Sequence, residues 1–160
     1  MPLYTVMTQD GFLSAEQRNV IAAELVRIHA TAMNVPAHFV HSIFPTYPRN
    51  RACVAANHSP VASILGGIRA GHPSDEKTRL VQALWKMIQD NTGISDSDLS
   101  VALQEVPPSQ AMENGGIMPD VGHEKKPSQT VVVSGPPRIL EELTRPAQRI
   151  EIGRDLKAKA

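Results

Sequence analysis

The second residue, Pro2, directly follows the initiator methionine and begins a strand-like run, LYTVMT. Proline has no backbone N–H to give a sheet, so strand formation alone does not explain its position. Loss of Met1 would leave Pro2 as a free secondary amine. An α-amino group ordinarily has a pKa of about 7.7–8.0, and apolar surroundings or a nearby arginine lower it. Pro2 could therefore act as a base or, when protonated, an acid; alternatively, a small second residue simply permits methionine removal.

Four other residues are candidates for chemistry, namely His29 in VRIHA, Arg69 and His72 in GGIRAGHPSDEK, and Glu113 in SQAMENGG. Arg69, at a predicted strand end, can offer a planar fork to a carboxylate or form a surface ion pair. His72 can give a hydrogen bond or simply occupy a turn. His29 lies at the edge of an apolar helical stripe, where a core-edge histidine is the usual interpretation. Glu113, in a segment rich in Gly, Asn and Pro, is equally typical of a solvated carboxylate.

The first half of the chain predicts a strand, a helix and a second strand. The strands are residues 3–8 and 39–44, the latter stopped by Pro45. Ser14 is expected to cap the helix, with Gln17 in capping-box spacing, and the helix should end near Met33 or Asn34. The expected buried stripe consists of Ile21, Leu25, Ile28 and Ala32.

The second half predicts the same order. Residues 63–69 form a strand, Ser74 caps a helix that ends at Thr92-Gly93, and residues 99–105 form the last strand. Asp75 and Glu76 fall in the first helical turn, where the helix dipole favours acidic residues. The expected buried face consists of Leu80, Leu84, Met87 and Ile88.

The two halves share one pattern, because SAEQRNVIAAELVRIH and SDEKTRLVQALWKMIQ match in cap, acidic first turn and apolar positions. A duplicated β-α-β unit, about residues 1–60 and 61–124, explains this match. Each crossover helix predicts a parallel strand pair. After residue 105 the chain becomes turn-rich, with room for one helical turn. Residues 125–160 are expected to be a peripheral extension or a subunit-contact arm, in which TVVVSG could form an edge strand and ILEELTR a short helix.

The composition is that of an ordinary soluble domain, with 160 residues, 41% hydrophobic and 20% charged. Lys plus Arg equal Asp plus Glu at 16 each, which argues against a nucleic-acid or membrane-surface binder. The single cysteine, Cys53, has no CxxC partner and agrees with a reducing compartment. No bilayer-spanning run or secretory signal is evident, so a cytoplasmic protein is expected. HFVH places two histidines on opposite faces of a strand, and no metal or cofactor is expected.

With these motifs in place, the sequence resembles the tautomerase superfamily, whose members use an amino-terminal proline on a tandem β-α-β fold. Within it, the chain is similar to the cis-3-chloroacrylic acid dehalogenase subgroup. The resemblance covers about residues 2–124 and is carried by PLYTV…QD, VRIHA, GGIRAGHPSDEK, and EVPPSQAMENGG followed by PDVGHE. It implies an α/β (α+β) fold with a four-stranded mixed sheet, two helices on one face and a homotrimeric assembly.

The resemblance also implies roles for the candidate residues. Pro2 falls on the catalytic proline, His29 on the first-helix histidine, Arg69 on a substrate-binding arginine and Glu113 on the water-activating glutamate. Two positions depart from the subgroup. His72 replaces a second carboxylate-binding arginine, and Ala102 replaces a tyrosine that helps to position water.

These departures favour a particular activity. Dehalogenation by water needs the positioned water, whereas keto–enol tautomerisation mainly needs the proline and a cation that holds the carboxylate. The sequence therefore predicts a tautomerase or hydratase acting on small unsaturated or 2-oxo acids, with weak or absent dehalogenase activity. The alternative is a catalytically degenerate relative that binds a ligand or a protein. A small carboxylate substrate and self-association are the expected partners.

Overall fold

In this computed structural model, the structure describes residues 2–113 and 115–123. The predicted TVVVSG strand, the short helix after it and the rest of the expected extension lie outside these residues. The main elements are β1 (Leu3–Gln9), α1 (Ala15–Met33), β2 (His41–Ile43), β6 (Ala62–Arg69), α2 (Ser74–Thr92) and β7 (Leu99–Val106). Short strands are β3 (Thr46–Tyr47), β4 (Cys53–Val54), β5 (Asn57–His58), β8 (Met112–Glu113) and β9 (Gly116–Ile117). Single 3-10 turns span Ala37–Phe39, Asp96–Asp98 and Pro108–Gln110.

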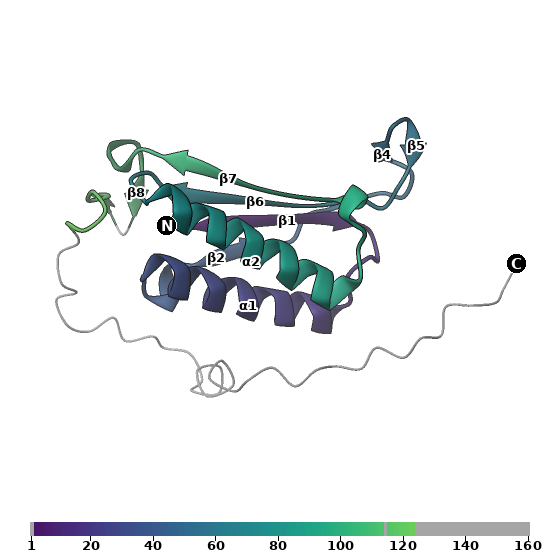
Figure 1. The fold of residues 1–160 in the computed structure, drawn as a ribbon, viewed down its shortest axis with the longest axis horizontal. Helices are drawn as coiled ribbons and strands as arrows, with labels where there is room; N and C mark the ends of the chain where they lie inside the picture. Colours follow the sequence, from purple (N-terminus) through teal and green to yellow (C-terminus); the bar gives the residue numbers. More distant parts are fainter. Residues whose placement is uncertain (1, 114, 124–160) are drawn as a thin grey trace, which may run out of the picture. The chain divides into compact units, whose positions relative to one another are not determined.

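The main strands form one mixed sheet in the order β2-β1-β6-β7, and β3 adds to the far end of β1. Within each half the strands are parallel, as predicted, with Leu3 opposite His41 in the first half and Ser63 opposite Ser100 in the second. The two halves meet through the antiparallel pair of β1 and β6. Both helices cover the same face of the sheet (Figure 1). The predicted tandem β-α-β fold with a mixed sheet and both helices on one face is confirmed, and β3 is a fifth strand beside the four that were predicted.

The core lies between the sheet and the two helices. Alternate residues of β1 and β6, such as Tyr4, Val6 and Ile64, are buried against the helices. The intervening residues face the other way, so Leu3, Met7 and Leu65 remain between 38% and 45% exposed. The helical core residues include Ile21, Leu25, Ile28, Leu80, Leu84, Met87 and Ile88, as expected. Met33 is also buried in the core, while Ala32 is only half-buried.

The helix termini follow the sequence with one correction. Ser14 and Gln17 form the predicted capping box, and α1 ends where Asn34 adopts a left-handed conformation. At α2, however, Ser74 is the first helical residue and Pro73 is the N-cap, with no side-chain capping bond. The prediction that Ser74 caps this helix is wrong, because Pro73 with a ψ of 146° already provides the extended residue before the first turn.

The predicted second strand is also shorter than expected. Residues 39–44 were expected to be extended, but a 3-10 turn ends at Phe39 and β2 spans only His41–Ile43. Beyond Pro45 the chain pairs again as β3, and then projects as the β4–β5 hairpin at one end of the sheet (Figure 1). The β8–β9 hairpin lies at the opposite end, beside the start of β1 (Figure 1). No described helix combines the length and apolar character needed to cross a membrane.

Candidate active site

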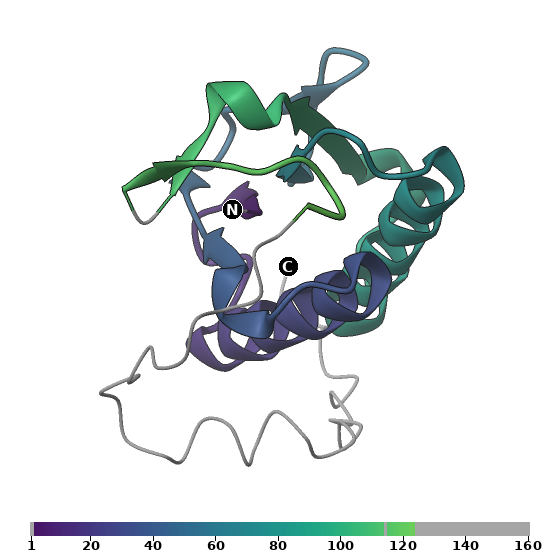
Figure 2. The ribbon, with the colours of Figure 1, turned by 90° about the vertical axis from the view of Figure 1, so that its left-hand side faces the viewer.

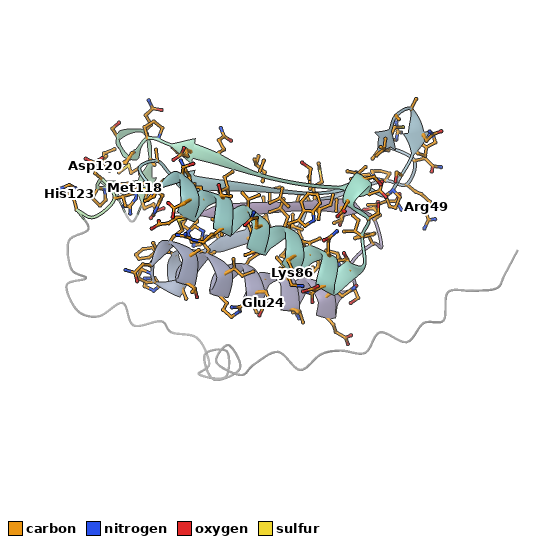
Figure 3. All side chains as sticks on the ribbon, in the orientation of Figure 1. Glu24, Arg49, Lys86, Met118, Asp120 and His123 are labelled. Atoms are coloured by element: carbon orange, nitrogen blue, oxygen red, sulfur yellow. The ribbon has the colours of Figure 1, made fainter. Side chains whose placement is uncertain are left out.

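A cavity of about 350 Å³ lies at the end of the sheet where β1 begins and β6 ends. Its lining includes Leu3, Arg69, Met112, Glu113 and Met118. The structure therefore brings together two predicted site residues, Arg69 and Glu113, from β6 and β8. The view along the sheet shows the 107–123 segment beside the amino terminus (Figure 2), and Met118 and Asp120 lie at this same end (Figure 3). The cavity combines a cation, a carboxylate and apolar side chains.

Arg69 is the last residue of β6, and its position in the alternation of the strand faces away from the helices. Its Nη1 donates a hydrogen bond of 2.9 Å to the carbonyl oxygen of Pro119, which fixes one edge of the guanidinium. The side chain is half-buried. A planar guanidinium at this position has the fork geometry that matches a carboxylate.

Glu113 owes its position to a hairpin that the sequence did not reveal. Met112 pairs with Ile117 and Glu113 pairs with Gly116, while Gly115 takes a φ of 81° in the turn. These strands are only two residues long, too short for a period-two pattern to be recognised. The hairpin turns Glu113 into the cavity with Met112, and its carboxylate oxygen Oε1 is inaccessible to solvent.

Pro2 is buried, and its carbonyl oxygen accepts a 2.9 Å hydrogen bond from the backbone N–H of His41. Pro2 does not itself line the cavity, but Leu3, the next residue, does. Successive residues of a strand point to opposite faces, so Leu3 reaches the cavity while Tyr4 points to the helices. The first residues of β1 thus have the cavity on one face of the sheet and a second, buried group of polar residues on the other face.

His29 and Tyr4 form this buried group. The side chains are 2% and 0% exposed, and the Tyr4 hydroxyl lies 2.6 Å from Nδ1 of His29. Burial, followed by the positive charges of His72 and of the amino terminus, lowers the pKa of His29 to about 4. Burial also raises the pKa of Tyr4. His29 is therefore a neutral, fully buried residue near the amino terminus, not a residue at the edge of the core.

His72 lies on this helix side of the sheet. Its side chain is 7% exposed, and its Nδ1 is 3.7 Å from Oε2 of Glu76. It is not among the residues that line the cavity with Arg69. Of the two residues predicted to bind substrate, Arg69 lines the cavity and His72 does not.

Ala102 lies on the exposed face of β7, opposite Leu65 of β6. This position, where the resemblance implies a tyrosine, is away from the cavity. Tyr4 could be considered from the sequence as a source of a hydroxyl, but its contact with His29 was not predicted, and Met112 and Met118 were missed. The alternation in LYTVMT places Tyr4 on the buried face and could have identified it, whereas no comparable signal marks the two methionines.

Another hollow, of about 390 Å³, lies between α2 and β7. Its cation, Lys77, forms a 2.8 Å ion pair with Glu105, which also lines that hollow. We favour the cavity of Arg69 as the site, because it contains predicted groups and adjoins the start of β1. Arg49 lies at the opposite end of the sheet (Figure 3). Among the described residues, no three His, Cys, Asp or Glu side chains gather as a metal site would require.

The chain matches the family model described as putative oxalocrotonate tautomerase enzyme over residues 1–130. The solved structure of native Ps01740 is 32% identical, with a TM-score of 0.68 over 69% of this chain and 99% of that one. A protein named N1, from the cis-3-chloroacrylic acid dehalogenase family, is 24% identical, with a TM-score of 0.71 over 75% and 85% of the two chains.

A fused 4-OT described as a wild-type symmetric trimer is 20% identical, with a TM-score of 0.67 over 72% of this chain and 94% of that one. The similarities below 25% identity establish a common fold. No curated protein sequence matches the chain significantly.

Proposed function

The chain belongs to the family of putative oxalocrotonate tautomerase enzymes, and on this basis we propose that Pro2, freed of Met1, is its general acid and base. The proposed substrates are small unsaturated or 2-oxo carboxylates, and the reaction is tautomerisation or hydration. The observation that carries the proposal is the cavity that holds Arg69 and Glu113 directly beside the first residues of β1. Arg69 binds the substrate carboxylate. Pro2 is buried, and burial favours a neutral amine.

Tautomerisation needs only proton transfers. In the enol-to-ketone direction, the neutral Pro2 amine takes the proton from the enol hydroxyl, and the protonated amine delivers a proton to the substrate carbon. The C=C bond becomes a single bond, the C–O bond becomes a carbonyl, and the amine returns to its starting state. Hydration additionally needs a water, which the Glu113 carboxylate would deprotonate. The tyrosine that the resemblance implies for hydrolytic relatives is absent, because Ala102 stands at its position, so dehalogenation of cis-3-chloroacrylate should be weak or absent.

The assembly proposed for this site is a homotrimer. Leu3, Met7, Ile43 and Leu65 are 38–49% exposed on the sheet face that the helices leave open. A continuous apolar face of this kind favours burial against another subunit. A fused 4-OT of the same fold is described as a symmetric trimer. Size-exclusion chromatography with light scattering should give three times the 17.4 kDa chain mass.

The first experiment asks whether Pro2 has a free amine. Intact-mass analysis of the purified protein should show loss of Met1. If Met1 remains, the Pro2 nitrogen is an amide and cannot take or give the proton, which would favour the binding-module alternative.

A chemical probe can then locate the reactive amine. One structural neighbour, Pt0534, is described as inactivated by 2-oxo-3-pentynoate. An alkyne conjugated to a ketone is open to attack by a neutral amine. The new N–C bond adds the whole reagent, and the amine proton moves to the neighbouring carbon. Peptide mapping should place this adduct on Pro2, and Pro2→Ala should react more slowly.

A substrate panel separates the possible reactions. The protein is incubated with a phenylenolpyruvate-like enol, a propynoate and cis-3-chloroacrylate, and the products are followed by proton NMR. We expect turnover of the enol or the propynoate and little of the chloroacrylate. Unchanged enol turnover by Pro2→Ala would contradict the role of the amine.

A further inference from the structure

The Tyr4–His29 hydrogen bond is a short, buried polar contact near the start of β1. The hydroxyl lies 2.6 Å from Nδ1, and the rings meet edge to face with centroids 5.6 Å apart and an interplanar angle of 73°. Both side chains are almost completely buried. A short hydrogen bond in such surroundings resists exchange with water and fixes both rings.

The donor and the acceptor of this bond can be assigned, because the buried phenol O–H needs a hydrogen-bond acceptor. Among the described residues, the Tyr4 hydroxyl has His29 as its hydrogen-bond partner. If Nδ1 donated its proton to the hydroxyl oxygen, the phenol O–H would be buried without an acceptor, which costs about 1–3 kcal/mol. If the phenol donates to Nδ1, the same contact satisfies the buried O–H. A neutral imidazole whose Nδ1 accepts carries its proton on Nε2.

The fold makes room for this arrangement. Tyr4 on β1 is paired with Gly66 on β6. A side chain at residue 66 would occupy the space of the Tyr4 ring, so glycine there allows the ring to lie across the neighbouring strand. The phenol is thus held by the sheet, and the imidazole by α1, before any substrate arrives.

We propose that Tyr4 is a positioning residue that holds His29 as the neutral tautomer protonated on Nε2, so that His29 serves as a hydrogen-bond donor and not as an acid or base. The catalytic part of this inference rests on the proposed function, whereas the tautomer does not. His29 does not line the cavity of Arg69, but it lies close to the amino terminus. A fixed neutral donor there can stabilise negative charge that develops on a substrate oxygen held at the Pro2 amine.

The electrostatic surroundings agree with this role. Burial, the largest cause, and the charge of His72 disfavour a second proton on the imidazole ring, and so keep His29 uncharged near neutral pH. His72 in turn lies close to Glu76. Tyr4 also stays protonated, because its burial raises its pKa.

The tautomer can be measured without any assay of activity. Two-bond proton–nitrogen NMR spectra of the full-length, histidine-labelled protein at pH 7 distinguish an accepting Nδ1 from a protonated one. His29→Gln identifies the signal by its loss. We expect an unprotonated Nδ1 and a protonated Nε2; a protonated Nδ1 would overturn the proposal even in a protein that shows no turnover.

The linkage to turnover is tested with Tyr4→Phe, which removes only the hydroxyl. We expect a loss of the single His29 tautomer and a fall in kcat of about tenfold with little change in KM, since one hydrogen bond is worth about that factor. In a His29→Gln background the same change should have no further effect on kcat.

Tyr47→Phe is the matched control, because the Tyr47 hydroxyl also donates a hydrogen bond, of 2.5 Å, to the carbonyl of Val61 at the other end of β1. It should alter stability without altering the His29 spectrum or kcat. Equal effects of both tyrosine variants on kcat, or additivity of Tyr4→Phe with His29→Gln, would show that Tyr4 has only a structural role. If Tyr4→Phe does not fold, the wild-type spectrum alone decides the tautomer.

Discussion

A Cβ atom added to Gly66 would lie 2.5 Å from Cε1 of Tyr4, its directly paired neighbour on β1, and 2.9 Å from Cδ2 of Leu103. The absence of a side chain at Gly66 therefore leaves the space that the buried Tyr4 ring occupies between the two central strands. Because Tyr4 also contacts His29, packing in the middle of the sheet is coupled to the chemistry proposed at its end.

Gly66→Ala should destabilise the protein by about 1–3 kcal/mol, because the tyrosine ring and Leu103 must both move. Urea denaturation measures the change. Gly67→Ala is the matched control, since a Cβ there would find its nearest neighbour, the Leu3 carbonyl oxygen, at an ordinary 3.7 Å. Similar losses for both variants would contradict a specific clash with the ring.

Ser14→Ala should lower the free energy of unfolding by about 1 kcal/mol, because the Ser14 side chain caps α1 through the backbone N–H of Gln17. Ser74→Ala is the comparison, since Ser74 lacks a capping bond at α2 and should change stability by less than about 0.5 kcal/mol. Thermal and urea unfolding should agree. A larger loss at Ser74 would restore it as the cap.

Arg69→Ala should raise KM for an active carboxylate substrate by about tenfold to a hundredfold, the value of one charge-assisted pair. Arg69→Lys should recover only part of the loss, because an ammonium cannot form a bidentate contact. Arg79→Ala serves as the control, because Arg79 is 65% exposed and pairs with Asp75 on the surface of α2. Steady-state kinetics would show KM unchanged in that variant.

His29 should make stability fall as the pH decreases. Its folded pKa of about 4 lies below the unfolded value of about 6.5, so below pH 6.5 the unfolded state binds the proton more readily. The loss begins near pH 6.5 and is complete near pH 4, with a total of about 3 kcal/mol. Urea unfolding between pH 7 and pH 5 avoids most carboxylate titration. His29→Gln should flatten the curve, whereas the variant of an exposed histidine, His58→Gln, should keep the wild-type slope.

The sequence predicted those elements whose local signals and burial agree. The Ser14 and Gln17 capping box, the apolar helical stripes and the alternation in the long strands all have one periodic interpretation. Pairs of residues such as Met112 and Ile117 do not, because a two-residue strand has no period and its location depends on contacts with distant segments. The cap of α2 was predicted wrongly for another reason. Serine is common both at the N-cap and in the first helical turn, and Pro73 occupies the N-cap, so Ser74 becomes the first helical residue.

For the candidate site as well, individual residues could be predicted from the sequence, but their arrangement in space could not. Arg69 could be placed at a strand end from sequence, and Glu113 could be placed in the turn-rich segment, but their common cavity depends on how the β8–β9 hairpin folds back. The burial of His29 could not be predicted from α1 alone, since a stripe of apolar residues does not tell which strand covers its edge. Tyr4 supplies that information only once β1 is packed against α1.

The hydrogen bond from His41 to the Pro2 carbonyl has a consequence for entropy. A catalytic lysine or histidine must have its side-chain torsions frozen before it can react, and each long side chain loses up to about 2 kcal/mol of rotamer freedom. The nitrogen proposed to react here belongs to the main chain, its φ angle is closed into a ring, and the next carbonyl is already tied to β2. Folding of the sheet thus orders the reactive atom in advance, and almost no torsional freedom remains to be lost when a substrate binds.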